Sequence, residues 1–158
     1  MNLGKIGTAM ITPFKKDGTI NYEELERIIN YLIENGTDAI IACGTTSENP
    51  TMSTEEKIEV VRFTVEKVAG RVPVIAGTGD NETAYSIMMT QKAEENGADG
   101  IMLVTPYYNK PNQRGMYAHF ETIAKQTKLP VMLYNVPGRT GANILAETTI
   151  ALSRDVEY

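Results

Sequence analysis

Asn96-Gly-Ala-Asp-Gly-Ile-Met-Leu-Val-Thr-Pro-Tyr-Tyr108 contains the pattern that decides the fold. Asn96-Gly97 is typical of a helix end, because glycine readily adopts the left-handed conformation that follows a last helical turn. The run Gly100–Val104 is apolar without alternation, which is typical of a strand buried on both faces of a parallel sheet. The residues Thr105–Tyr108 then predict a loop at the carboxyl end of that strand.

The same pattern recurs along the chain with a period of roughly 30 residues. The other apolar runs are Ile6–Ile11, Ala39–Cys43, Val72–Ala76 and Pro130–Tyr134. Between the runs lie segments whose apolar residues recur at helical spacing. The first two segments carry these residues at Leu25, Ile28, Ile29, Leu32 and Ile33, and at Ile58, Val61, Val65 and Val68.

Local signals mark where the helices begin and end. Asn21 with Glu24, and Ser53 with Glu56, are capping-box patterns. Asn81, after the short turn Gly77–Gly79, is predicted to cap the next helix. Helix ends are predicted at Gly36, Gly70 and Gly97.

Strands that alternate with helices predict an α/β fold with a parallel sheet. A doubly wound sheet and a (β/α)8 barrel both fit, but no Gly-x-Gly-x-x-Gly follows the first strand. Polar and glycine-rich loops after nearly every strand favour the barrel, which needs eight units in ~250 residues. The chain supplies about five, the last with a short helix around Leu145–Ser153. We therefore expect a partial TIM barrel, one incomplete domain over 1–158, with exposed sheet edges that favour self-association.

Composition excludes several classes of function. The chain has 158 residues, 42% of them hydrophobic and 22% charged, as in soluble globular proteins. A net charge of -5 argues against a nucleic-acid partner, and the apolar runs are too short to span a membrane. Cys43 is the single cysteine and His119 the single histidine, so no disulfide or usual zinc site is expected. No cofactor is expected, and the cytoplasm is the default location.

Gly44-Thr-Thr-Ser-Glu48 follows the second strand. The hydroxyl groups of Thr45 and Thr46, with the backbone N–H groups of a glycine turn, can hold a small carboxylate. The same residues also fit a turn whose threonines only satisfy local backbone groups. The motif alone leaves both interpretations open.

Tyr134 and Arg139 are the chemical groups at the end of the fifth strand. The phenol of Tyr134 is expected at the mouth of the barrel, where a tyrosine bonded to a threonine hydroxyl can relay a proton. It equally fits a core ring with a locally satisfied hydroxyl group. Arg139 suits bidentate recognition of a carboxylate, although a surface role is open to it.

Five other residues carry weaker signals. Tyr107 and Tyr108 are more typical of packing or of an interface than of catalysis. Cys43 is expected to be inert and buried, and His119 to be a surface or core residue. Lys110 lies in a loop after a strand, but a flexible, solvated lysine is a poor Schiff-base nucleophile.

Five motifs in order resemble the dihydrodipicolinate synthase family, now called 4-hydroxy-tetrahydrodipicolinate synthase. They are Thr8–Phe14, Gly44–Thr51, Val72–Gly79, Val104–Pro111 and Leu133–Gly141. The resemblance implies a class I aldolase on a TIM barrel that condenses pyruvate with aspartate semialdehyde on the route to diaminopimelate and lysine. It also implies a homo-oligomer, in which one subunit donates a tyrosine to its neighbour's site.

The resemblance also assigns roles to residues. Thr45, Tyr134 and Tyr108 match the family's proton-relay triad, with Tyr108 as the residue donated across the interface. Thr45 and Thr46 would hold the carboxylate of pyruvate, and Arg139 that of the semialdehyde. Ser47 stands where the family usually has a glycine, and it would strain the turn if that position needs a positive φ.

Four positions bear on regulation in a full-length parent. At the family's lysine feedback site, Asn81 and Tyr107 match. Lys57 and Tyr85 replace a histidine and a glutamate of lysine-sensitive members. We therefore expect weak or absent inhibition by lysine.

The family's Schiff-base lysine lies on the sixth strand, beyond Tyr158, and no lysine occurs from Leu129 to Tyr158. Covalent attachment of pyruvate is central to the mechanism, so this chain alone is expected to be inactive. Two alternatives stay open: a non-catalytic truncated or engineered partial barrel, and a related pyruvate-dependent lyase such as N-acetylneuraminate lyase. The pair Arg139-Thr140 favours the synthase over that lyase.

Overall fold

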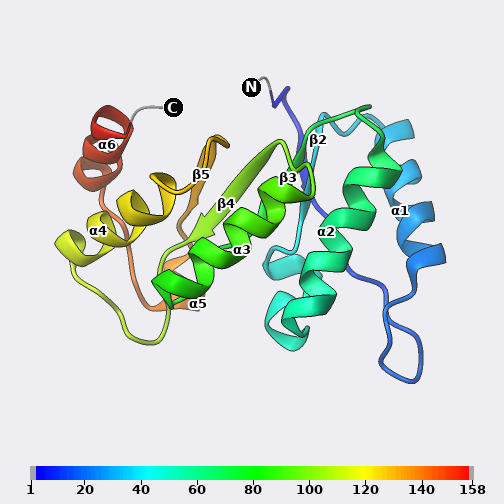
Figure 1. Ribbon diagram of the computed structural model, residues 1–158, viewed down its shortest axis with the longest axis horizontal. Helices are drawn as coiled ribbons and strands as arrows, with labels where there is room; N and C mark the ends of the chain where they lie inside the picture. Colours follow the sequence, from blue (N-terminus) through cyan, green and yellow to red (C-terminus); the bar gives the residue numbers. More distant parts are fainter. Residues whose placement is uncertain (1–2, 157–158) are drawn as a thin grey trace.

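The computed structural model describes residues 3–156, so the first and last two residues of the expected 1–158 unit lie outside the described residues. Strands and helices alternate (Figure 1). The strands are β1 Gly7–Ala9, β2 Ala39–Ala42, β3 Val74–Gly77, β4 Gly100–Val104 and β5 Val131–Tyr134. The helices are α1 Tyr22–Glu34, α2 Thr54–Val68, α3 Thr83–Glu95, α4 Gln113–Ala124, α5 Pro137–Thr140 and α6 Ala146–Asp155, and the 3-10 turns are η1 Thr45–Ser47 and η2 Asn49–Thr51.

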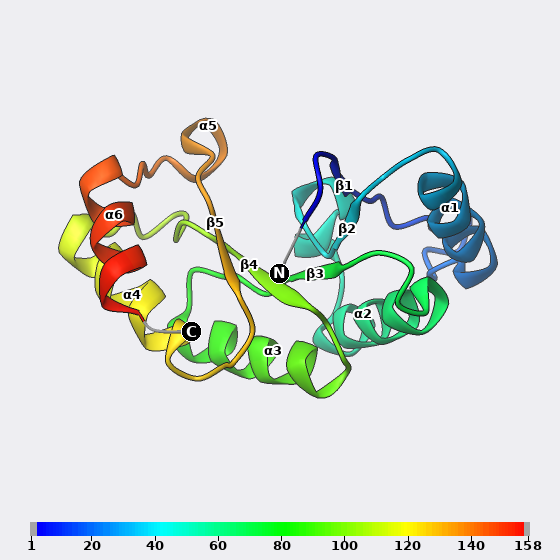
Figure 2. The same ribbon diagram turned by 90° about the horizontal axis from the view of Figure 1, so that it is seen from above.

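The five strands form one parallel sheet in the order β1-β2-β3-β4-β5. Each strand therefore pairs with its neighbours in sequence, without the reversal of order that a doubly wound sheet has. Figure 2 shows the strands as an open arc, with α1 to α4 along its outer side. This arrangement confirms the expected α/β fold of about five units, half of a barrel.

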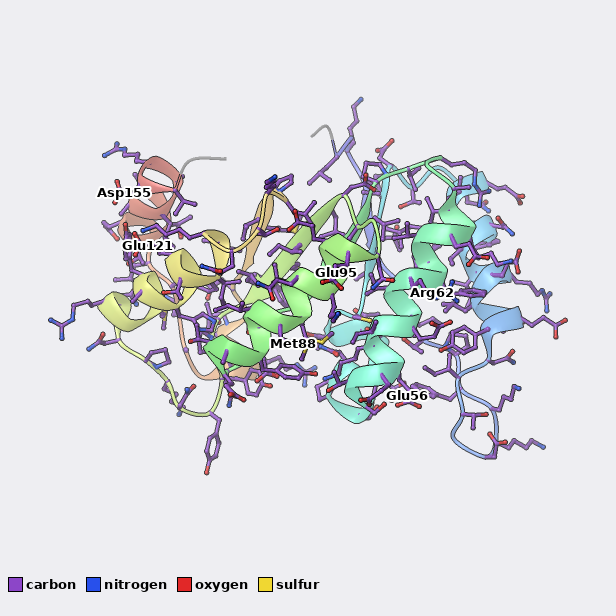
Figure 3. All side chains as sticks on the ribbon, in the orientation of Figure 1. Glu56, Arg62, Met88, Glu95, Glu121 and Asp155 are labelled. Atoms are coloured by element: carbon purple, nitrogen blue, oxygen red, sulfur yellow. The ribbon has the colours of Figure 1, made fainter. Side chains whose placement is uncertain are left out.

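The core lies between the outer face of this arc and the helices. Ile101 and Leu103 of β4 are fully buried there, with Phe120 and Ile123 of α4. Met102 and Val104 point to the other face and line a cavity inside the arc, as the alternation of side chains along a strand requires. Charged side chains such as Arg62, on the helix-covered side, face away from the sheet (Figure 3).

The two edge strands differ from the three central ones. No residue of β1 or β5 is fully buried, and Ile6 beside β1 is 57% exposed. Burial on both faces, predicted for all five strands, is thus wrong for the edges, because each edge strand has one neighbour only. Along the part of the chain that the structure describes, no helix is long and apolar enough to cross a membrane.

Most of the predicted helix boundaries are confirmed. Ser53 and Glu56 form the reciprocal capping box. At α1 only half of the box forms: Asn21 accepts from the backbone of Glu24, whose carboxylate accepts from Arg27 instead. The three predicted terminal glycines all have a positive φ: 88° at Gly36, 72° at Gly70 and 82° at Gly97.

One prediction about local structure is wrong, and one short helix was not predicted. Asn81 does not cap α3, whose N-cap is Glu82. The side chain of Asn81 instead donates to the Tyr107 carbonyl oxygen at 3.3 Å, which links two loops. The last helix is confirmed as α6, but the short helix α5 before it was not predicted, because its four residues are too few for a periodic signal.

Candidate functional site

A cavity of about 240 Å³ opens inside the arc at the carboxyl ends of the strands. Loops after four consecutive strands line it, which is where barrel enzymes carry their sites. The lining residues are Cys43, Gly44, Thr45, Asn49, Pro50, Lys57, Gly77, Gly79, Asp80, Met102, Val104, Tyr107, Tyr134, Val136, Arg139 and Thr140.

Three of the five predicted site residues meet at this cavity. Thr45 reaches it from η1, Tyr134 from the end of β5, and Arg139 from α5. Thr46 follows Thr45 in η1 but does not line the cavity. Tyr108 lies outside it, is 88% exposed and has a left-handed backbone with φ 67°. The structure therefore brings Thr45, Tyr134 and Arg139 together and leaves Thr46 and Tyr108 apart from them.

Tyr134 is half-buried, and its hydroxyl makes no hydrogen bond to Thr45 within residues 3–156. Its backbone is fixed, because its carbonyl oxygen accepts from the Thr105 N–H at 3.0 Å. The Arg139 guanidinium is exposed and pairs with no carboxylate of residues 3–156. Both groups are therefore available to a ligand in the cavity.

The turn that carries Thr45 is tightly built. Cys43 and Glu48 adopt positive φ values of 56° and 58° on either side of it. The Ser47 hydroxyl donates to the Gly44 carbonyl oxygen at 2.7 Å. The positive φ falls on Glu48 and not on Ser47, so the condition under which Ser47 would strain the turn is not met.

Gly77 and Gly79 let the strand ends approach one another beneath the cavity. A Cβ atom on Gly77 would meet the Cys43 carbonyl oxygen, and one on Gly79 would meet the backbone of Leu103 and Val104. Since backbone atoms cannot move aside as a flexible side chain can, alanine at either position would force the loops apart. These glycines therefore hold three strand ends in contact at the floor of the site.

Cys43 is 1% exposed, and burial raises the pKa of its thiol to about 12. A thiol with that pKa stays protonated at neutral pH and is a poor nucleophile. This agrees with the inert role that we expected.

Lys57 and Asp80 are cavity residues that sequence reasoning did not place in the site. Lys57 is 9% exposed; its ammonium group donates to the Tyr85 hydroxyl at 3.3 Å and lies 5.3 Å from the centre of that ring. Asp80 accepts a 2.8 Å hydrogen bond from the Tyr107 hydroxyl. The sequence could have indicated Asp80, because it lies directly after a strand. It gives no such indication for Lys57, which lies inside a helix.

Two other polar residues lie outside the cavity. Lys110 has a left-handed backbone, and its side chain packs against Gly141, at the end of the loop that carries Arg139. His119 is buried between α3 and α4, and its Nδ1 lies 2.9 Å from the Thr83 hydroxyl. Among the described residues, no group of three His, Cys, Asp or Glu side chains could hold a metal ion.

Comparison with known proteins agrees with this geometry. A model of the Dihydrodipicolinate synthetase family matches residues 2–157. The 4-hydroxy-tetrahydrodipicolinate synthase of Bacillus subtilis (strain 168) is 60% identical over 156 residues, which are 99% of this chain and 54% of that protein. The enzyme of the same name from Desulforamulus reducens is 52% identical over 156 residues, which cover 99% of this chain and 53% of that protein. The chain thus spans about half the length of the curated relatives it matches.

Solved structures of the same kind of enzyme also superpose closely on this chain. Dihydrodipicolinate synthase DapA-2 from Bacillus anthracis superposes with a TM-score of 0.96 at 54% identity, over 97% of this chain and 52% of that one. The chloride-inhibited dihydrodipicolinate synthase from Acinetobacter baumannii, solved in complex with pyruvate, gives a TM-score of 0.94 at 43% identity, over 96% and 52% of the two chains. These matches confirm that the five units correspond to the first part of a larger barrel.

Proposed function

The chain belongs to the dihydrodipicolinate synthetase family, and on that premise we propose that it forms the substrate-holding wall of a 4-hydroxy-tetrahydrodipicolinate synthase. The reaction is the class I aldolase condensation of pyruvate with aspartate semialdehyde, on the route to diaminopimelate and lysine. The observation that carries the proposal is the meeting of Thr45, Tyr134 and Arg139 at one cavity.

The two substrates carry carboxylates, and the wall offers a place for each. The Thr45 hydroxyl group, with the backbone N–H groups of the Thr45-Thr46 turn, would hold the carboxylate of pyruvate; the Thr46 side chain, which does not line the cavity, would contribute through its backbone only. Arg139, which has no carboxylate partner in residues 3–156, would bind the carboxylate of the semialdehyde in a bidentate contact. The loops after β2 and β5 would thereby hold both substrates over one floor.

Proton transfer is the second task of the wall. Tyr134 and Thr45 would act as relay groups, because both residues line the same cavity and a hydroxyl can accept one proton while it passes on another. Tyr108 would complete the relay in the site of a neighbouring subunit. The high exposure of Tyr108 and its place outside its own cavity support that role.

The group that this chain would not supply to the site is the nucleophile, the Schiff-base lysine. Among the cavity-lining residues Lys57 is the one lysine, and its ammonium group is engaged with Tyr85. A Schiff-base lysine must present an uncharged amine to the substrate carbonyl. We propose that the chain in isolation does not attach pyruvate and that a lysine of another segment completes the site.

A split barrel tests the proposal. This chain is co-expressed with the part of the Bacillus subtilis relative that lies beyond the matched segment. The assembled protein is then assayed for condensation of pyruvate with aspartate semialdehyde. We expect activity that falls by about 100-fold or more in Tyr134→Phe and Thr45→Val, as loss of a proton-transfer group does. Tyr31→Phe, on the exposed face of α1, is the matched control and should leave the rate unchanged.

An active assembly that is indifferent to both site substitutions would contradict the assignment. A well-folded but inactive assembly that binds neither substrate would favour a non-catalytic partial barrel.

A further inference from the structure

We propose that Thr140 is a positioning residue that fixes the direction in which Arg139 faces the cavity, through a hydroxyl pair with Thr105. The inference rests on the proposed function, because it concerns how the Arg139 guanidinium meets a carboxylate. Thr140 is 4% exposed and Thr105 is fully buried, so both hydroxyl groups lie away from solvent.

The Thr140 hydroxyl group uses its full bonding capacity. It accepts from the Thr105 hydroxyl at 3.3 Å and from the Ala142 N–H at 3.2 Å. Its proton can reach the Ala142 carbonyl oxygen at 2.9 Å or the Val136 carbonyl oxygen at 3.2 Å. One side chain thus ties both ends of α5 together, since Val136 precedes this helix and Ala142 follows it.

Thr105 connects this loop to the neighbouring strand. Its backbone N–H donates to the Tyr134 carbonyl oxygen at 3.0 Å, and its hydroxyl donates to Thr140. Thr105 is therefore bonded both to the backbone of Tyr134 and to the loop that carries Arg139, and it holds the two in a fixed relative position. A shift at this pair would move two groups of the site relative to each other.

The Arg139 side chain depends on this backbone support. Within residues 3–156 its guanidinium makes no hydrogen bond, while its backbone N–H donates to the Val136 carbonyl oxygen at 2.8 Å. Bidentate recognition needs a guanidinium plane aligned with the carboxylate, and a small misplacement of a binding group has a large effect. Because no hydrogen bond or ion pair holds the Arg139 side chain within residues 3–156, the anchored loop is the support that sets where this side chain begins.

Side-chain NMR of the arginine Nε–H groups tests the inference on the 158-residue chain. The Arg139 signal is assigned by its loss in Arg139→Lys. Succinic semialdehyde is the probe for the Arg139 contact, and pyruvate is the probe for the Thr45 backbone N–H. The variants are Thr140→Val, which keeps the shape and removes the hydroxyl, and Thr140→Ser, which restores it. Thr122→Val on the exposed side of α4 is the matched control, because this hydroxyl also donates to a backbone carbonyl oxygen.

We expect Thr140→Val to weaken the binding of succinic semialdehyde roughly tenfold, as loss of buried hydrogen bonds behind a charged contact would. The affinity for pyruvate should change less than about twofold, and Thr140→Ser should restore the semialdehyde affinity. Thr105→Val removes only one of the hydrogen bonds of the Thr140 hydroxyl, so we expect a smaller loss of semialdehyde affinity, about threefold. This variant takes the place of Thr140→Val if Thr140→Val does not fold.

Equal weakening for both probes would show a general structural role and overturn the inference. So would unchanged semialdehyde binding in Thr140→Val. If the wild-type chain binds pyruvate but not the semialdehyde, the carboxylate role of Arg139 falls, and the inference falls with it.

Discussion

The Tyr107 hydroxyl donates a 2.8 Å hydrogen bond to Oδ2 of Asp80, which joins the loops after β3 and β4 at the rim of the cavity. Burial, together with the Asp80 carboxylate that accepts this bond, raises the pKa of Tyr107 to about 12 from an ordinary value of 10.0. The neutral phenol is therefore the form that the folded protein favours.

This contact predicts a loss of stability at high pH. A raised pKa in the folded state contributes stability that is fully present below the unfolded value and is lost as the pH rises through the folded value. As the pH is raised from about 10 to about 12, the urea concentration at which half of the protein is unfolded should fall. This fall should be smaller in Tyr107→Phe. Tyr31→Phe is the control, because that side chain is 64% exposed. An equally steep fall in Tyr107→Phe would contradict the assignment.

The packing between the sheet and the helices predicts that truncating Leu103 lowers the free energy of unfolding strongly. This side chain is fully buried in β4, so Leu103→Ala should lower the free energy of unfolding by about 2–5 kcal/mol. Leu145 is 46% exposed, and Leu145→Ala should cost less than about 1 kcal/mol. Urea denaturation of both variants checks the difference, and similar midpoints would show that the sheet is not packed as described.

The open edges predict self-association. The outer face of β5 lies in an apolar groove with Val131, Leu133, Leu152 and Val156, and the edge of β5 has no neighbour within residues 3–156. Such edges pair readily with other chains. Light scattering should give a mass above 17.4 kDa that grows with concentration. Met132→Lys on β5 should reduce it and Met88→Lys on α3 should not, while a sharp monomer at high concentration would count against the idea.

The position of the Lys57 side chain predicts weak feedback inhibition by lysine in a full-length protein that contains this chain. Its ammonium group already lies over the Tyr85 ring and donates to the Tyr85 hydroxyl, so a second ammonium group there would meet repulsion. Lysine at micromolar concentration should leave the condensation rate nearly unchanged. Strong inhibition in that range would refute the prediction, and Lys57→His is the variant expected to increase sensitivity.

Much of the fold follows from local signals in the sequence. Apolar runs marked the strands, and Gly36, Gly70 and Gly97 marked helix ends because each needs a positive φ. The meeting of Thr45 with Tyr134 also followed, since parallel strands bring their carboxyl ends to one edge of a sheet.

Other parts of the site depend on tertiary structure. Thr45 lines the cavity and Thr46 does not, a difference set by how η1 is oriented. Lys57 reaches the cavity only through the rotation of α2 against the sheet. The sequence singled out Thr140 beside Arg139 but gave no signal for its hydroxyl bond to Thr105, because the two residues are far apart in sequence.

Borohydride trapping with pyruvate, read by intact mass, tests the central claim most directly. It is applied to the 158-residue chain alone and to the barrel assembled with the remaining part of the Bacillus subtilis relative. We expect no adduct on the chain alone and one reduced pyruvate adduct in the assembly, on a lysine of the added part. A stable adduct on any lysine of this chain, Lys57 and Lys110 included, would contradict the claim that it holds the substrates without supplying the nucleophile.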